Sequence, residues 1–252
     1  MTCLASKFLV PLNRAALMNQ TQHLVSVGYH YFNTGSVPVA KASGLLDKFA
    51  ALYPIVATPS QRSTNHAKRI ANVDLLWSED PQDPHRLCWT LLATKGRTIP
   101  GEPGFPDPIH QRERMKDARF VAPLWDSHYR LHQRLLGGAQ DPDAKAKHRG
   151  AKLRWTWSMT RETFAGWASQ VRQAAHVGDR AYQTVFSNLV TSPMYGGIRA
   201  DLRELERSGY RAWLENHRRD SYRMPLPSPL PSMPRIQVYA RMTLEDLICS
   251  AS

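Results

Sequence analysis

Two proline-rich stretches interrupt this chain of 252 residues and limit where regular secondary structure can run. Residues Gly101–Pro108 read Gly-Glu-Pro-Gly-Phe-Pro-Asp-Pro, and five prolines fall between Met224 and Pro234. Proline fixes φ and has no backbone N–H, so neither stretch can form the interior of a helix or a central strand. We therefore expect a domain boundary at 101–108 and a stiff, extended spacer at 224–234.

The first hundred residues alternate short apolar strands with amphipathic helices, which predicts a small α+β unit. We expect strands at residues 7–12, 25–31, 37–39, 70–77 and 87–93. We expect helices at 14–23, where Asn13 is the cap, and at 43–53. Asn33-Thr34-Gly35 predicts a turn between two strands, and the polar residues 58–66 predict a loop.

After the first proline-rich stretch the pattern becomes helical. The expected helices cover residues 123–136, 160–175 with Thr160 as the cap, a segment that begins at Asp179, and 196–217. Residues 236–240 then alternate as a strand does, which indicates that the helices interrupt the sheet domain. The expected fold class is α+β, with a core of residues 1–100 and 235–252, a basic helical insertion at 101–223, and the spacer at 224–234.

The positive charge of the chain is concentrated in its middle. The formal net charge is +12, and residues 112–161 hold twelve Lys and Arg against five Asp and Glu, a net of +7 in a fifth of the length. A concentrated field of one sign attracts a polyanion, because neutralising phosphates releases counterions. The nucleic-acid contacts predicted in this stretch are Arg112, Arg114, Lys116, Arg119, Arg130, Arg134, Lys145, Lys147, Arg149, Lys152, Arg154 and Arg161.

A second basic feature lies in the helix expected at 196–217. Arg199, Arg203, Arg207 and Arg211 recur every fourth residue, so they form a slowly winding ridge and are also predicted to contact nucleic acid. The alternative is a solvent face neutralised by nearby acidic residues. Those residues are Glu204, Glu206 and Glu215.

Trp155 and Trp157 alternate with Arg154 and Thr156 inside the basic stretch. A base can stack on an aromatic ring while a neighbouring arginine holds a phosphate, so these rings are predicted contacts for a single strand. Tryptophan is also commonly packed inside proteins, which is the alternative for both rings.

The sequence holds no complete catalytic or metal-binding motif. It lacks a glycine-rich phosphate loop with a lysine, a nucleophile elbow and a zinc-protease helix, and its three cysteines are too far apart in sequence for a zinc site or a disulfide framework. No apolar run reaches the length of a membrane span. We therefore expect a cytoplasmic protein without a cofactor, a metal or a membrane partner.

Histidine is the residue type best suited to acid–base chemistry here, because its ordinary pKa lies near neutrality. His30 is the first candidate, since it lies outside the alternating apolar face of its expected strand. His128 and His132 lie four residues apart in an expected helix, but without the acidic residue of a zinc-protease motif we expect them to be structural. Cleavage of RNA without metal would proceed by attack of a 2′-hydroxyl on its own phosphate, with histidine or lysine moving protons.

In layout the chain resembles the repeat-processing endoribonucleases of type IV CRISPR systems, which belong to the RAMP superfamily. The shared features are a small N-terminal α+β unit, an arginine-rich helical insertion at about 111–219, and a C-terminal return strand. The resemblance implies a ferredoxin-like core, recognition of a repeat hairpin, retention of the crRNA product, and membership of an antiviral ribonucleoprotein complex with other subunits. Arg241, on the return strand beside the expected core, joins His30 and His23 as the catalytic candidates.

Three functional hypotheses follow from the sequence. The first is a CRISPR RNA-binding endoribonuclease that cleaves a hairpin without metal. The second is a non-enzymatic DNA-binding or replication-accessory protein of a mobile element, favoured by the arginine ridge. The third is an RNA-binding structural subunit of a ribonucleoprotein complex, which would bind RNA and leave it intact.

Overall fold

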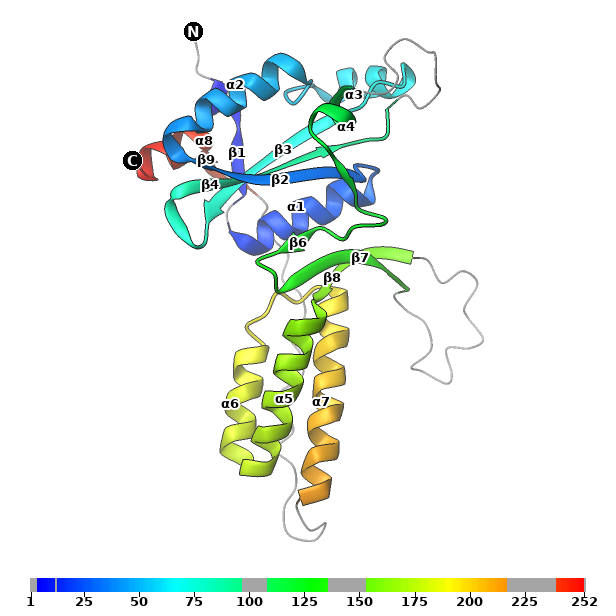
Figure 1. Ribbon diagram of the computed structural model, residues 1–252, viewed down its shortest axis with the longest axis vertical. Coiled ribbons are helices and arrows are strands. Elements are labelled where there is room, and N and C mark those ends of the chain that lie inside the picture. The colour runs from blue at the N-terminus through cyan, green and yellow to red at the C-terminus, as the bar shows by residue number, and fades with distance from the viewer. Residues whose placement is uncertain (1–3, 12, 97–107, 136–152, 217–238, 252) are drawn as a thin grey trace. The chain divides into compact units, whose positions relative to one another are not determined.

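The computed structural model describes residues 4–11, 13–96, 108–135, 153–216 and 239–251 (Figure 1). Helices alternate with strands that pair in antiparallel sheets, so the expected mixture of α and β structure is confirmed. The contacts of the chain divide it into two compact units. Unit 1 comprises Met1–Ala122 and Ile236–Ser252, and unit 2 comprises Pro123–Arg235.

Unit 1 is built on a four-stranded sheet with the order β3-β4-β2-β5. Its strands are β2 (Tyr31–Pro38), β3 (Val73–Asp80), β4 (Asp83–Ala93) and β5 (Lys116–Asp117). In the β3–β4 hairpin, Val73 lies opposite Ala93 and Trp77 lies opposite Trp89. The strand pair predicted at 70–77 and 87–93 is therefore confirmed.

Two long helices, α1 (Arg14–Ser26) and α2 (Ala42–Leu52), lie on opposite sides of this sheet (Figure 1). Both helices were expected from the sequence, and the predicted cap is present because the Asn13 side chain accepts a hydrogen bond from the Ala16 N–H at 2.9 Å. The core on the α2 side joins buried residues of α2 and the sheet. It includes Leu46, Phe49, Leu75, Trp77, Leu87 and Leu91.

The strand predicted at 25–31 is wrong, because α1 continues to Ser26 and β2 begins only at Tyr31. Leu24 and Val25 are buried on the helix. Gly28, in the connection between α1 and β2, has a φ of 110°. The turn predicted at 33–35 is also wrong, since these residues lie within β2.

Gly35 is needed in β2 for packing and not for a turn. It lies opposite Trp89 in the sheet, and a Cβ at this position would lie 2.5 Å from the nearest atom of the indole ring. A glycine inside a strand often marks such a close approach. The sequence alone does not show which aromatic ring occupies that space.

The loop predicted at 58–66 is instead helix α3 (Pro59–Ala67). Thr58 is the N-cap, and its side chain accepts a hydrogen bond from the Gln61 N–H while the Gln61 side chain accepts one from the Thr58 N–H. This reciprocal capping box, with Pro59 at the first helical position, starts the helix. No side chain of α3 is fully buried, so the helix lacks the apolar periodicity that would have indicated it.

A C-terminal strand, β9 (Tyr239–Thr243), pairs antiparallel with β1 (Leu9–Pro11). It overlaps the end of the strand predicted at 236–240, whose first three residues lie outside the described residues, as does the spacer predicted at 224–234. Among the described strands β1 and β9 form a separate sheet, so the ferredoxin-like arrangement is not confirmed. Helix α8 (Leu244–Ala251) follows and places Leu244 and Leu247 in the core of unit 1. Two short 3-10 turns span Leu4–Lys7 and Val39–Lys41.

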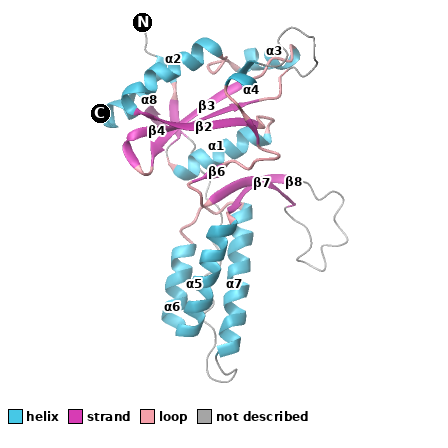
Figure 2. Ribbon diagram, in the orientation of Figure 1, coloured by secondary structure: helices cyan, strands magenta, loops and turns pink. Residues whose placement is uncertain are grey.

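The described residues of unit 2 form a three-stranded sheet and three helices (Figure 2). The strands are β6 (Leu124–Trp125), β7 (Tyr129–Leu135) and β8 (Leu153–Met159). The helix predicted at 123–136 is therefore wrong. At the start of β7, exposed Arg130 lies between buried Tyr129 and buried Leu131, which is the period of a strand and not of a helix.

The remaining helices of unit 2 are α5 (Arg161–Val177), α6 (Asp179–Leu189) and α7 (Gly196–Asn216), and all three were predicted. Thr160 caps α5 as expected, by accepting a hydrogen bond from the Thr163 N–H. A Cβ on Gly209 of α7 would lie 2.6 Å from Val171 of α5 and 2.7 Å from Tyr182 of α6. Glycine at this position therefore allows the three helices to pack closely.

Candidate nucleic-acid interface

The predicted cations fall into two groups that belong to different units. Unit 1 carries Arg112, Arg114, Lys116 and Arg119, all of them exposed. In unit 2 the predicted contacts that the structure describes lie on β7, β8, α5 and α7. Four predicted contacts lie outside the described residues: Lys145, Lys147, Arg149 and Lys152.

The cations of unit 1 belong to a stretch that we call the basic segment, residues Arg112–Val121. It begins at the end of helix α4 (Pro108–Arg112) and is fastened to the sheet. Strand β5 pairs with β2, with Lys116 opposite Phe32. The Asn33 side-chain amide of β2 donates a hydrogen bond of 2.7 Å to the Glu113 carbonyl. The basic segment is therefore held in a defined conformation against one edge of the sheet.

The two acids of the basic segment are engaged within unit 1. The Glu113 side chain is only 10% exposed, accepts a hydrogen bond of 2.6 Å from the Tyr53 hydroxyl, and lies 3.8 Å from the Lys48 ammonium. Asp117 is 15% exposed and bonds to Arg119, with 2.9 Å between Nε and Oδ1. The negative charges are thus used internally, while Arg114 and Lys116 face solvent. Arg112 is exposed as well, and its side chain also hydrogen-bonds to the Tyr53 hydroxyl.

Arg119 lies between two aromatic rings. Its guanidinium carbon is 5.8 Å from the centre of the Tyr31 ring and 6.0 Å from that of Phe120, distances typical of cation–π contacts. Hydrogen bonds and charge from Arg119 hold the pKa of the Asp117 carboxyl below its ordinary value, so the pair is ionised near neutrality. The Tyr31 ring also contacts His110, with 4.4 Å between ring centroids.

Phe120 is the most exposed large apolar residue of the described chain, with 85% of its surface accessible. It stands on a turn organised by Asp117. The Asp117 carbonyl accepts hydrogen bonds from the N–H groups of Phe120 and Val121 at 3.0 and 2.8 Å, and its carboxylate accepts one from the Arg119 N–H. Phe120 was not predicted as a contact, because one phenylalanine next to an arginine does not show which way the ring points.

His30, the first catalytic candidate, lies beside the basic segment. Its backbone carbonyl accepts a hydrogen bond of 2.7 Å from the Ala118 N–H. Burial, together with the positive charge of Arg119, lowers the pKa of His30, so the imidazole is neutral at physiological pH. The structure therefore places a predicted acid–base residue next to a predicted nucleic-acid contact.

The other two catalytic candidates do not join this group in the described contacts. His23 is exposed on α1, and the hydrogen bond described for it is that of its backbone carbonyl with the Val27 N–H. Arg241 lies in β9, which pairs with β1, and its side chain is outside the described part of the chain. The three residues are not shown to form one catalytic cluster.

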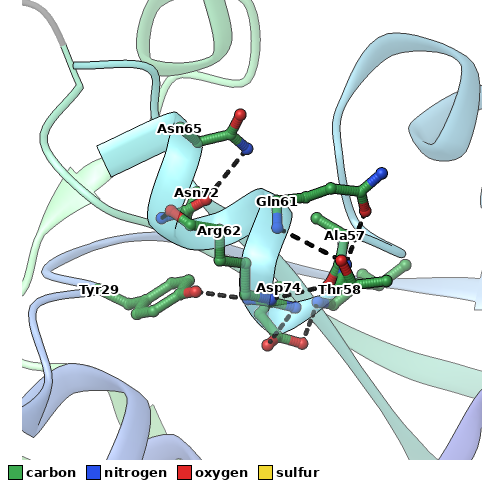
Figure 3. A network of polar contacts seen from close by, with 9 residues as sticks. Tyr29, Ala57, Thr58, Gln61, Arg62, Asn65, Asn72 and Asp74 are labelled. Carbon is green, nitrogen blue, oxygen red and sulfur yellow. Dashed lines mark hydrogen bonds and ion pairs between the residues drawn. The ribbon is translucent and has the colours of Figure 1, made fainter. Parts of the chain in front are cut away.

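A polar network fixes the chain just before His30 (Figure 3). Arg62 of α3 donates a hydrogen bond to the Tyr29 hydroxyl, forms an ion pair of 3.2 Å with Asp74 of β3, and donates from Nε to the Ala57 carbonyl at 3.1 Å. Burial raises the pKa values of both Tyr29 and Asp74. Arg62 thus joins α3, β3 and the α1–β2 connection, which supports the position of His30.

In unit 2, the register of β7 and β8 places Arg130, His132 and Arg134 on one sheet face, with Arg154 opposite Arg134. Arg134 is held by an ion pair of 3.1 Å to Asp201 of α7, so its charge is partly neutralised. The His132 ring is 2.9 Å from the Ser158 hydroxyl, and burial lowers the pKa of His132. His132 is therefore a packed residue on a strand, which agrees with the structural role expected for it but not with a helical position.

Trp155 and Trp157, predicted as stacking rings, are both buried in the structure, 8% and 1% exposed. Each ring projects from β8 on the face opposite to Arg154, together with Met159. The prediction that they stack on bases is therefore wrong for this conformation. The alternative of packed tryptophans is confirmed.

The arginine ridge lies on the outer side of α7. Arg203, Arg207 and Arg211 are exposed and Arg199 is half-buried, while the opposite side of the helix is buried and includes Ile198. Arg161, at the start of α5, is also exposed. These exposed arginines form a second basic surface on unit 2, and their exposure fits both the predicted nucleic-acid contact and the alternative of a solvent face.

Metal ligands, membrane spans and similarity to known proteins also bear on what the site can do. Among the described residues, no group of three or more His, Cys, Asp or Glu side chains is arranged to hold a metal ion. Of the helices that the structure describes, none has both the length and the apolar character that a membrane span requires. Comparison of the chain with protein-family models, curated proteins and solved structures gives no significant match. The chemistry of the surface is therefore the basis for assigning a function.

Proposed function

We propose that the protein binds RNA, and that the basic segment of unit 1 is a principal contact with the phosphate backbone. The observation that carries this proposal is that the acidic side chains of the basic segment have partners within unit 1, while most of its basic side chains are exposed. Glu113 is nearly buried against Tyr53 and Lys48, and Asp117 is paired with Arg119, whereas Arg114 and Lys116 are exposed and have no acidic partner within the segment. A surface of this kind attracts phosphates, and the release of counterions from the polyanion drives association.

The aromatic ring among these cations favours RNA over duplex DNA. A regular duplex covers its base faces, so an exposed ring gains little there, whereas RNA is mostly read in loops and bulges with unstacked bases. Phe120 is such an exposed ring, next to the cations of the basic segment. The arginine ridge on α7 supports the second candidate, duplex DNA, because a slowly winding row of cations also suits a groove or a phosphate backbone.

A metal-independent cleavage of the bound RNA is an additional proposal, supported by the position of His30. A neutral imidazole beside Arg119 would accept a proton from a 2′-hydroxyl as its oxygen bonds to the adjacent phosphorus, while a neighbouring cation stabilises the negative charge on the phosphoryl oxygens. The bond from phosphorus to the 5′-oxygen would break, that oxygen would take a proton from water, and a 2′,3′-cyclic phosphate would remain. The finer assignment, a repeat-processing CRISPR endoribonuclease within a ribonucleoprotein, stays a prediction from the layout of the sequence.

Fluorescence anisotropy with labelled nucleic acids tests the proposal. The full chain is titrated with a hairpin RNA carrying an unpaired loop and with a duplex DNA of the same length, at several salt concentrations and with excess chelator. We expect tighter binding to the hairpin RNA and an affinity that falls as salt rises. Tighter binding to the duplex DNA would support the second candidate, and binding to neither would refute the proposal.

The same samples, run on a denaturing gel, test cleavage. A product that forms in chelator with the wild-type protein and is lost in His30→Ala would support the role of His30. An intact RNA in a tight complex would instead favour an RNA-binding structural protein.

A further inference from the structure

We propose that Phe120 is a stacking platform for one unpaired base of the nucleic acid, with the adjacent cations holding the phosphates on either side of it. This inference rests on the proposed function and narrows its ligand to nucleic acid with unpaired nucleotides. It concerns a side chain that was not among the contacts predicted from the sequence.

The first argument is the exposure of the ring on an ordered turn. Burying a phenylalanine side chain stabilises a folded protein, so a ring left 85% exposed forgoes that stabilisation. The turn is nevertheless well defined, because the Asp117 backbone and side chain together bond to the N–H groups of Arg119, Phe120 and Val121. A ring presented on a fixed turn loses little conformational freedom when a ligand binds.

The second argument is the chemistry around the ring. Every nucleotide combines a flat base with a charged phosphate. The Phe120 ring suits the base, and the cations that precede it in the chain suit the phosphate. Arg112, Arg114 and Lys116 precede it by at most eight residues and are exposed. Stacking of bases on aromatic rings combined with cations along the backbone is the usual way in which proteins bind single strands.

Arg119 lies beside the ring but is not available as a simple phosphate contact. Its guanidinium bonds to Asp117 and, at 3.3 Å, to the Tyr31 hydroxyl. Arg119 therefore acts chiefly as a positioning residue that keeps the turn and the Phe120 ring in place. This changes the role predicted for Arg119 from the sequence.

An exposed phenylalanine could also bind an apolar surface of a protein partner. Val121, the next residue, is 48% exposed and would add to such a contact. The charge around the ring favours the nucleotide, because cores of protein interfaces are depleted in charged residues, whereas nucleic-acid interfaces are rich in cations. The protein partner is kept as an outcome of the test.

The experiment compares Phe120→Ala with the wild-type chain on two RNA probes. One is a hairpin with 2-aminopurine in its loop, and the other is a fully paired RNA duplex of equal length. We expect Phe120→Ala to weaken binding to the hairpin loop by about 5- to 100-fold and to leave the affinity for the duplex unchanged. The wild-type protein should also quench the 2-aminopurine, and the variant should not.

Two further variants show whether a loss of binding comes from the loss of the aromatic ring or from a general loss of apolar surface. Val56→Ala is the matched control, since it removes an exposed apolar side chain of unit 1 outside the basic segment and should leave both affinities unchanged. Phe120→Trp should retain hairpin binding, because the larger ring also stacks. Thermal melting checks that each variant is folded, which is expected for a side chain that touches so little of the protein.

If Phe120→Ala binds the hairpin as the wild type does, while neutralising Arg112, Arg114 and Lys116 abolishes binding, the stacking inference is overturned and the proposed function stands. If neither Phe120→Ala nor the neutralisation of the three cations affects RNA binding, the stacking inference and the proposed role of the basic segment are both overturned. A change in sedimentation of Phe120→Ala without a change in RNA affinity would identify the ring as part of a protein–protein interface and would also overturn the inference.

Discussion

Replacing Gly35 by alanine should destabilise unit 1, although alanine is the better residue for a strand in general. Glycine costs about 0.5–1 kcal/mol relative to alanine inside a strand, so the backbone term alone predicts a small gain. The new Cβ, however, would lie 2.5, 2.7 and 2.9 Å from three atoms of the Trp89 indole. Contacts this short require either the ring or the strand to move.

The expected net cost follows from these two terms. Overpacking of a well-filled interior costs about 1–3 kcal/mol. The Trp89 ring has little freedom to move, because its edge also packs on Phe49 of α2 at 5.4 Å between ring centroids. We therefore expect Gly35→Ala to lower the free energy of unfolding by up to about 2 kcal/mol after the backbone gain is included.

The measurement is chemical denaturation of four proteins that form a double-mutant cycle: wild type, Gly35→Ala, Trp89→Leu and the double variant. In the Trp89→Leu background the ring is absent, so Gly35→Ala should become neutral or slightly stabilising. Gly44→Ala is the matched control, since a Cβ at Gly44 meets nothing within 4 Å and alanine should stabilise α2. An equal cost for Gly35→Ala with and without the Trp89 ring would refute this explanation.

Two other predictions concern ionisable groups. The folded-state pKa of His132 is lowered from 6.5, so the unfolded chain binds more protons, and the free energy of unfolding should fall as pH drops from about 6.5 toward the lowered value. His132→Gln should reduce this pH dependence, measured by denaturation at several pH values, and His30 should supply a residual effect of the same sign. Arg62→Ala should cost about 1–3 kcal/mol, because the largely buried Asp74 loses its charged partner, and adding Asp74→Asn should recover part of the loss. If His132→Gln has the same pH dependence of unfolding free energy as the wild type, the lowered pKa of His132 is contradicted. If Arg62→Ala is as stable as the wild type, the stabilising role of the Arg62–Asp74 ion pair is contradicted.

Much of the fold could be predicted where the local pattern and the tertiary contacts agree. The long helices α2, α5 and α7 have apolar stripes that are buried in the structure, and the β3–β4 hairpin has alternating apolar residues on both strands. Thr160 and Asn13 mark the starts of helices because their side chains satisfy backbone N–H groups locally. These signals need no knowledge of distant residues.

The errors in the fold have two different physical causes. Helix α3 could have been predicted, since Thr58, Pro59 and Gln61 form a complete capping box, but the lack of an apolar stripe hid it. Gly35 could not have been read correctly, because its role depends on a tryptophan more than fifty residues away. The pairing of β9 with β1 depends in the same way on contacts between the two ends of the chain.

The composition of the candidate site was easier to predict than its geometry. Charge is costly to bury, so the predicted cations of the basic segment and of α7 are almost all on the surface. Aromatic residues are stable both inside and outside, and the sequence therefore could not show that Trp157 is buried and Phe120 exposed. Nor could it show that Asp117 and Glu113 turn their charges to internal partners.

The central claim, that the basic segment binds the RNA backbone, is tested most directly by the salt dependence of RNA affinity. The variant neutralises three cations, as Arg112→Gln, Arg114→Gln and Lys116→Gln. The matched control neutralises three exposed cations elsewhere on unit 1, namely Lys41, Arg69 and Lys95. If each cation of the segment meets one phosphate of a single strand, the slope of log K against log salt should become less steep by about 2 in the variant. The control should keep the wild-type slope, and equal slopes for the wild type and the segment variant would contradict the account.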